Sequence, residues 1–143
     1  MANETLNAAS SAYASFISSA SVATDDMSAA SSTVATALST GSEDLYPTLD
    51  FKLKVTAGTV TAGDVINLYR RPSDGTDAAP VPAETSASTL QEYVGSFTLN
   101  SNSETRYKYG VKNCHTGDTY YLHNTGAASI TMQLYVRGST YGN

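Results

Sequence analysis

The sequence predicts an all-β protein, with a single β-sandwich domain carried behind a polar N-terminal arm. From Leu45 onward, apolar and polar residues alternate with a period of two, and Gly, Pro, Asn and Asp recur between the alternating runs. The residues before this point have a different composition, dominated by Ala, Ser and Thr, with no glycine before Gly41 and no proline before Pro47. A chain of 143 residues has room for one such domain.

The clearest alternation near the start of the predicted sandwich lies in residues 48–55, where four apolar residues face one way and four polar residues face the other. This pattern is typical of a half-buried antiparallel strand. Further strands are predicted over residues 64–70, 91–99, 104–112, 119–124 and 129–137. Turn residues separate these strands and no convincing helix lies between them, which favours a sandwich over a βαβ arrangement. We expect the sandwich to be of jelly-roll type.

The strand predicted over residues 104–112 has an unusual polar face. Tyrosines and a valine alternate there with basic residues, the two sets being Tyr107, Tyr109 and Val111 on one side and Arg106, Lys108 and Lys112 on the other. By the same reasoning as for the other strands, the apolar set is expected to face the core.

Residues 1–44 are predicted to form the arm and residues 45–143 the sandwich. Within the arm, a thin apolar stripe has helical spacing and consists of Leu6, Tyr13, Phe16 and Ile17. A helix over residues 4–20 would be marginal alone, because short isolated helices gain too little to offset nucleation, so the stripe would need a partner surface. The alternative is an extended arm that becomes ordered on assembly. Residues 31–38 are equally compatible with a first strand.

The formal charge of −5 lies entirely in the predicted arm, which has five acidic residues and no Lys or Arg. The predicted sandwich is electrically neutral, so no basic field is available to attract a phosphate backbone, and nucleic-acid binding is not expected. No apolar run approaches the roughly 20 residues that cross a bilayer, so no membrane partner is expected. The first residues lack the basic start and apolar run of a signal peptide, which predicts synthesis and solubility in a host cytoplasm.

Residues with the potential for chemistry do not form a recognisable constellation. Cys114 is the only cysteine, so neither an intrachain disulfide nor a Cys-based zinc site is expected. His115 and His123 have Asp118 between them but lack the spacing that makes two histidines converge on a metal. Residues 74–77 look like a fragment of a calcium loop without its closing Glu, which favours an ordinary turn. The sequence predicts no metal site, no cofactor and no catalytic residue.

The ten tyrosines indicate a possible binding surface. Under the alternation described above, Tyr69 and Tyr135 point outward from their strands. Exposed tyrosines are enriched at protein interfaces and also suit sugar-stacking surfaces, whereas cross-strand pairing on a sheet face is a purely structural alternative. We predict that Tyr69 and Tyr135 are interface residues, with oligomer or assembly contacts ahead of glycan binding. Residues 76–90 form a long polar connection that is a further candidate for contacts.

Two segments carry a resemblance to a known family. Residues 68–76 read Leu-Tyr-Arg-Arg-Pro-Ser-Asp-Gly-Thr, and residues 93–97 read Tyr-Val-Gly-Ser-Phe. In this order, over residues 45–137, the chain resembles a family of small virion proteins of tailed bacteriophages. Members of that family are jelly-roll modules associated with the capsid, described as decoration, cement or head-fibre proteins.

The resemblance implies a non-enzymatic structural role on the capsid surface of a virion. The implied partner is the major capsid protein of the assembled head shell, and the implied assembly is a homo-trimer that ties neighbouring shell subunits together. The arm, with its stripe of Leu6, Tyr13, Phe16 and Ile17, would gain order by docking onto this partner. The alternative function is a receptor- or glycan-binding β-module of a tail or fibre.

Overall fold

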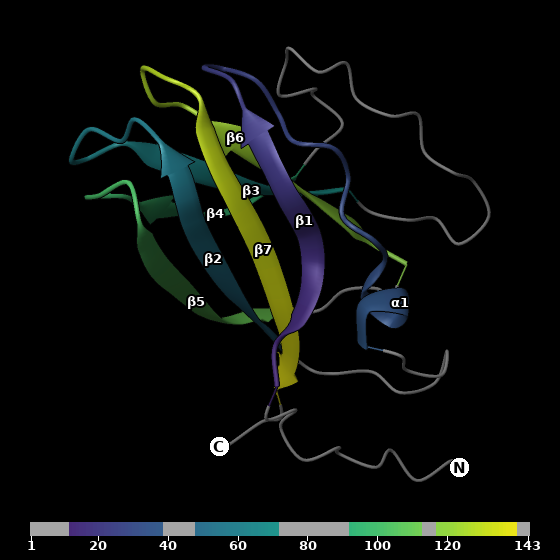
Figure 1. Cartoon of the computed structure of the whole chain (residues 1–143). Coiled ribbons are helices and arrows are strands. Elements are labelled where there is room, and N and C mark those ends of the chain that lie inside the picture. Colours follow the sequence, from purple (N-terminus) through teal and green to yellow (C-terminus); the bar gives the residue numbers. More distant parts are fainter. Residues whose placement is uncertain (1–11, 39–47, 72–91, 113–116, 140–143) are drawn as a thin grey trace, which may run out of the picture.

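The computed structural model describes residues 12–38, 48–71, 92–112 and 117–139. In chain order the elements are β1 (Ala14–Val22), α1 (Val34–Leu38), β2 (Thr48–Gly58), β3 (Val65–Arg71), β4 (Glu92–Thr98), β5 (Glu104–Lys112), β6 (Thr119–Asn124) and β7 (Ile130–Ser139). They form two antiparallel sheets packed face to face, which confirms the predicted all-β sandwich (Figure 1). The six strands predicted after the arm are all present, with ends shifted by at most three residues.

The strands divide into two sheets that we call sheet A and sheet B. Sheet A has the order β1-β7-β2-β5, and sheet B, which lies behind it in Figure 1, has the order β4-β3-β6. Every neighbouring pair of strands is antiparallel.

The core lies between the sheets and is built by the period-two alternation. Its fully buried side chains include Leu49, Phe51, Leu53, Ile66, Leu68, Tyr120, Leu122, Met132 and Leu134. An aromatic cluster joins the two sheets, because the Tyr120 ring of β6 lies 5.0 Å from Phe51 of β2 and 5.4 Å from Phe16 of β1. Burying an apolar side chain of this size stabilises the fold by about 1.5–3 kcal/mol, so these residues dominate the stability of the sandwich.

The expectation of a helix over residues 4–20 is wrong for its described part, because Ala14–Val22 forms strand β1 along the free edge of β7. Two irregularities in the β1–β7 register, between Ser15 and Ile17 and between Ile17 and Ala20, interrupt the alternation. They allow the adjacent residues Phe16 and Ile17 both to be buried in the core. Consecutive apolar residues of this kind have no period of two, which is why the sequence indicated a helix.

A segment without regular strand geometry completes the edge of sheet B. Met27 forms an isolated bridge to His123 of β6, and the Ser28 and Ser31 N–H groups donate to the carbonyls of Leu122 and Tyr120. The hydroxyls of the same two serines accept the N–H groups of Leu122 and Tyr120 at 3.0 Å and 2.9 Å. Serine side chains thus replace the carbonyls of a regular neighbouring strand, and the serine-rich composition of this region has a structural cause.

With residues 25–31 counted as an eighth strand, the connectivity is that of a jelly roll. The first, eighth, third and sixth strands then form one sheet, and the second, seventh, fourth and fifth form the other. The sequence is compatible with a strand over residues 31–38, but in the structure Val34–Leu38 forms the short helix α1. The hydroxyl of Thr33 accepts the N–H of Thr36 as an N-cap, and Val34 is fully buried in the core.

The predicted boundary after residue 44 is therefore wrong for residues 12–38, which belong to the sandwich. Phe16, Ile17, Val22 and Val34 are all members of its hydrophobic core. Phe16 and Ile17 are consequently not available as the partner-binding stripe of an arm, because their apolar surface is already covered by the chain itself. Leu6, the first member of that stripe, lies outside the described residues.

Candidate functional site

The outer face of sheet A carries a cluster of aromatic and basic side chains that we call the tyrosine face. It consists of Tyr13, Tyr107, Tyr109 and Tyr135 together with Lys52 and Arg137. Tyr107 and Tyr109 are 50% and 63% exposed. Their rings are parallel to within 2°, with centroids 5.9 Å apart, and the Tyr13 ring lies 6.0 Å from Tyr107. Large rigid rings held in one exposed group are typical of binding surfaces.

The two cations of the tyrosine face are stacked on its rings. The Lys52 ammonium lies 5.0 Å from the centroid of Tyr13 and 4.4 Å from that of Tyr135, and the Arg137 guanidinium lies 4.6 Å from that of Tyr13. Cation–π contacts of this kind fix the ring orientations. Tyr135 therefore points outward as predicted, although it is half-buried beneath Lys52.

A buried carboxylate anchors the tyrosine face to the sheet. Asp50 of β2 accepts hydrogen bonds from the Arg137 Nε at 2.9 Å and from the Gly110 N–H at 3.0 Å. The hydrogen bond to Asp50 raises the pKa of Arg137 above its ordinary value. Burial raises the pKa of the Tyr13 phenol, against the opposing effect of Arg137. At neutral pH the Tyr13 phenol is therefore neutral and lies beside the positive charge of Arg137.

A bulge in β5 determines which of its residues face outward. Gly110 has a φ of +69°, a conformation that glycine adopts without strain, and the β2–β5 register shifts between Leu49 and Phe51 opposite it. Before the bulge, Tyr107 and Tyr109 point outward, which corrects the expectation that they face the core. After the bulge, Val111 packs against the core. The inward side of β5 before the bulge is instead occupied by the half-buried Arg106 and Lys108.

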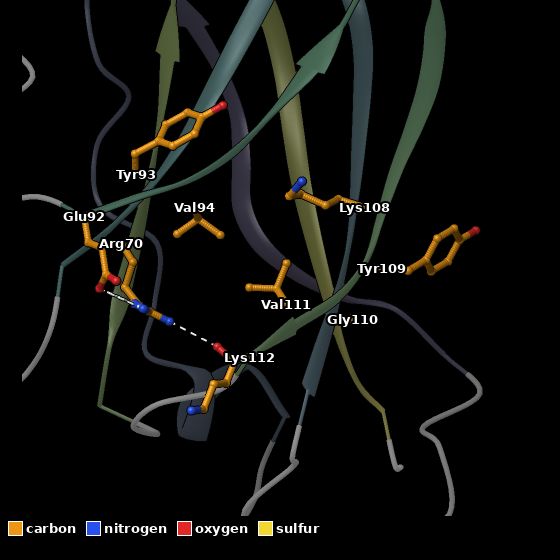
Figure 2. Close-up of a pocket in the computed structure, with 9 residues that line it drawn as sticks. All are labelled: Arg70, Glu92, Tyr93, Val94, Lys108, Tyr109, Gly110, Val111 and Lys112. Atoms are coloured by element: carbon orange, nitrogen blue, oxygen red, sulfur yellow. Dashed lines mark hydrogen bonds and ion pairs between the residues drawn. The ribbon is translucent and has the colours of Figure 1, made fainter. Parts of the chain in front are cut away.

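The second candidate feature is a cleft of about 390 Å³ between the edge strands β4 and β5, which we call the edge cleft (Figure 2). Its lining consists of Arg70, Glu92, Tyr93, Val94, Lys108, Tyr109, Gly110, Val111 and Lys112. Figure 2 shows Val94 and Val111 turned into the space between the strands, with Arg70 on one side and Lys108 on the other. Three of the chain's eight basic residues line this cleft, against one acidic residue.

Arg70 closes one end of the edge cleft and ties the two sheets together. Its side chain leaves the inner face of β3 and is only 9% exposed. One guanidinium nitrogen donates to the Glu92 carboxylate on β4 at 2.7 Å, and another donates to the Lys112 carbonyl on β5 at 3.1 Å (Figure 2). A guanidinium can make both bonds because its donors diverge in a rigid plane.

Lys108 occupies the other side of the cleft and depends on a glycine opposite it. Gly95 of β4 is buried, and a Cβ atom added to it would collide with the Lys108 Cε. The missing side chain at position 95 thus provides the room in which the lysine lies. Among the described residues, the Lys108 ammonium has neither an ion-pair nor a hydrogen-bond partner.

The remaining residues predicted from the sequence lie apart from these two features. Tyr69 points outward from sheet B, where its ring lies 5.8 Å from Tyr93 and 6.0 Å from His123. Cys114, His115 and residues 74–77 and 76–90 lie outside the described residues. Within the described residues no group of three or more His, Cys, Asp or Glu side chains is placed to hold a metal ion.

Sequence reasoning missed the edge cleft, although its signal was the run of basic residues that alternates with tyrosines in residues 104–112. No protein-family model matches the chain, and no curated protein matches it significantly. In the part of the chain that the structure describes, no helix has the length and apolar character needed to cross a membrane.

Proposed function

We propose that this chain is a non-enzymatic structural protein of a virion, a capsid decoration module that binds the assembled head shell through its tyrosine face. The resemblance of residues 45–137 to small phage virion proteins supports the class of partner. The observation that carries the choice of surface is the exposed pair Tyr107 and Tyr109, stacked in parallel on the outside of sheet A.

The tyrosine face has the properties of an interface that binds with little loss of entropy. Tyrosine supplies a large contact area with only two side-chain torsions, and here neighbouring cations and rings already restrict those torsions. The anchor of the face, the ion pair between Arg137 and Asp50, joins the adjacent central strands β7 and β2. Lys52 and Arg137 favour a neutral or acidic patch on the shell subunit.

Assembly as a homo-trimer on the shell belongs to the same proposal. Three copies held together present three tyrosine faces to repeated sites, so each contact can be weak while the whole complex stays bound. The trimer is expected on the particle. The mass of the protein that is released from washed particles under mild conditions gives its oligomeric state.

The proposal is tested by adding purified variants to shells that lack the protein. The shells are then sedimented, and the copies of the variant bound to them are counted. The double variant Tyr107→Ala/Tyr109→Ala is expected to bind at least about tenfold more weakly, because truncated tyrosines at interface centres cost about 2 kcal/mol or more. Tyr93→Ala is the matched control. Tyr93 is 57% exposed, comparable to the other two, but it lies on sheet B, so its loss should leave shell binding unchanged.

Two outcomes contradict this proposal. Undiminished shell binding by the double variant excludes the tyrosine face as the docking surface. Failure of the wild-type protein to bind shells, together with binding to host-cell surface glycans, favours the receptor-binding alternative of a tail or fibre module.

A further inference from the structure

The edge cleft concentrates positive charge in a chain that is acidic as a whole. Arg70, Lys108 and Lys112 line it with Glu92 as the single acid, whereas the chain has 13 acidic residues against eight basic ones. The one acid is already engaged, because its carboxylate accepts two hydrogen bonds from Arg70. The charge that this pairing leaves in the cleft belongs to the two lysines.

Lys108 is the residue that makes this charge available to a ligand. Its side chain is half-buried on the inward side of β5, and no described residue pairs with its ammonium. An ammonium that no described residue pairs with can take a charge-assisted contact with an anion. Because Gly95 opens the space for this side chain, the arrangement depends on a pair of residues from two different sheets.

The rest of the cleft fits a small, rigid and partly apolar molecule. Val94 and Val111 are turned into the cleft and provide apolar surface there (Figure 2). The volume of about 390 Å³ falls in the range of small-ligand pockets. Apolar surface beside two lysines is suited to a small ring that carries an acidic group, and a sugar acid is a molecule of this kind.

An extended peptide is a poorer fit to the same cleft. A peptide that added itself to β5 would need a regular ladder of backbone hydrogen bonds, which the bulge at Gly110 interrupts. The inward-pointing Lys108 opposes strand addition as well, since inward charges on edge strands are a common protection against pairing.

We propose that the edge cleft binds an acidic saccharide, with the Lys108 ammonium pairing with its carboxylate and Val94 and Val111 contacting its ring. This site is separate from the tyrosine face, and the proposal does not depend on shell binding.

The test is a titration of the intact, isotopically labelled protein followed by backbone amide resonances. The probe is methyl glucuronide, the control ligand is the neutral methyl glucoside, and sodium sulfate is the free-anion control. Saturable shifts with the glucuronide are expected at the amides of Val94, Gly95 and residues 108–111, with little response to the glucoside. Lys108→Met should weaken glucuronide binding at least about tenfold, since a charge-assisted contact is lost.

Two further variants distinguish a specific loss of glucuronide binding at this site from a general effect of charge and from misfolding of the protein. Lys54→Met removes the same charge from an exposed position on the outer face of β2, and it should bind the glucuronide like the wild type. Gly95→Ala keeps every charge but places a Cβ where the flexible end of Lys108 lies, so it should weaken binding by displacing that side chain. Wild-type amide spectra outside the cleft verify that each variant is folded.

Several results would overturn the proposal. Absence of saturable shifts with the glucuronide does so directly, and so does equal weakening by Lys54→Met and Lys108→Met. Equal binding of the glucoside removes the role of the carboxylate. Saturation by sulfate without saturation by the glucuronide shows an anion site that excludes saccharides. Wild-type affinity in folded Gly95→Ala refutes the placement of Lys108.

Discussion

On one side of the sandwich, residues 25–38 run between the last strands of the two sheets; on the other side, β4 and β5 face each other across the edge cleft. The first side is closed by hydrogen bonds to both sheets. The Ser31 N–H donates to Tyr120 of sheet B, the next N–H donates to Phe16 of sheet A, and the Asn124 amide donates to the Val22 carbonyl. We call this the sealed side and the other the open side.

The open side is built from charges instead. Arg70 spans the two sheets at one end, Lys108 points inward, and Arg106 pairs with Glu104 at 2.9 Å. In one sandwich, the contacts that stabilise the fold and the space that can admit a ligand can thus lie on different sides. Apolar burial and neutral hydrogen bonds give the sealed side its stability, whereas the open side keeps polar groups and space that a ligand can use.

The largest expected effect comes from removing part of the sealed side. Deletion of residues 1–22 removes β1 with Phe16, Ile17 and Val22 from the core, so the remaining chain should lose cooperative unfolding. Urea denaturation followed by circular dichroism measures this. A truncated chain that unfolds in a single sharp transition near the wild-type midpoint would show that β1 is dispensable.

A single hydroxyl of the sealed side is expected to have the next largest effect. Ser31→Ala leaves the buried N–H of Tyr120 without its acceptor, which should lower the free energy of unfolding by about 1–3 kcal/mol. Ser18→Ala, at an exposed position of β1, is the matched control and should change it by less than about 0.5 kcal/mol. Equal effects of the two substitutions would mean that the serine ladder to β6 contributes nothing.

Glu104 should make the stability of the open side depend on pH. Burial opposes ionisation of Glu104, but hydrogen bonds from the Asn100 and Ser101 N–H groups and the charge of Arg106 outweigh it and lower the pKa. Because the folded-state pKa lies below the unfolded one, the stabilisation is present above the unfolded value of about 4.3 and is lost as pH falls through the folded value.

Glu104→Gln should therefore destabilise the protein by about 1 kcal/mol at pH 7, and the difference from wild type should shrink as the solution becomes more acidic than about pH 4. Urea unfolding across the pH range measures it. A difference that stays constant down to the lowest pH would contradict the assignment of this carboxylate. The effect of Ser31→Ala should be constant over the same range, since no charge is involved.

The smallest expected effect is at the centre of the open side. Lys108→Met removes an ammonium that no described residue pairs with and keeps the apolar stem of a half-buried side chain, so stability should stay within about 0.5 kcal/mol of wild type. A free energy of unfolding that is lower than that of the wild type by more than about 2 kcal/mol, measured with urea, would mean that Lys108 stabilises the open side and is not available to bind a ligand.

The strands from β2 to β7 were predictable because their core residues follow the period of two that a half-buried sheet requires. The N-terminal region was not, since the bulges in β1 place Phe16 and Ile17 side by side in the core, and residues 25–31 pair with β6 through serine hydroxyls that leave no apolar pattern. In the same way Gly110 reverses the faces of β5.

The candidate sites were predictable only in part. The outward orientation of Tyr69 and Tyr135 follows from alternation along their own strands. The edge cleft depends on Lys108 meeting Gly95, and these residues come from different sheets, so no local pattern could bring them together. The tyrosine face likewise depends on the contact of Tyr13, just before β1, with Tyr107 on β5, at the opposite edge of the sheet.

The most direct test of the proposed function is the copy number of this chain in purified, salt-washed virus particles, measured by quantitative mass spectrometry against the major capsid protein. We expect a fixed ratio that corresponds to regular positions over the whole shell. Absence of the chain, or only a few copies per particle, would contradict the decoration role.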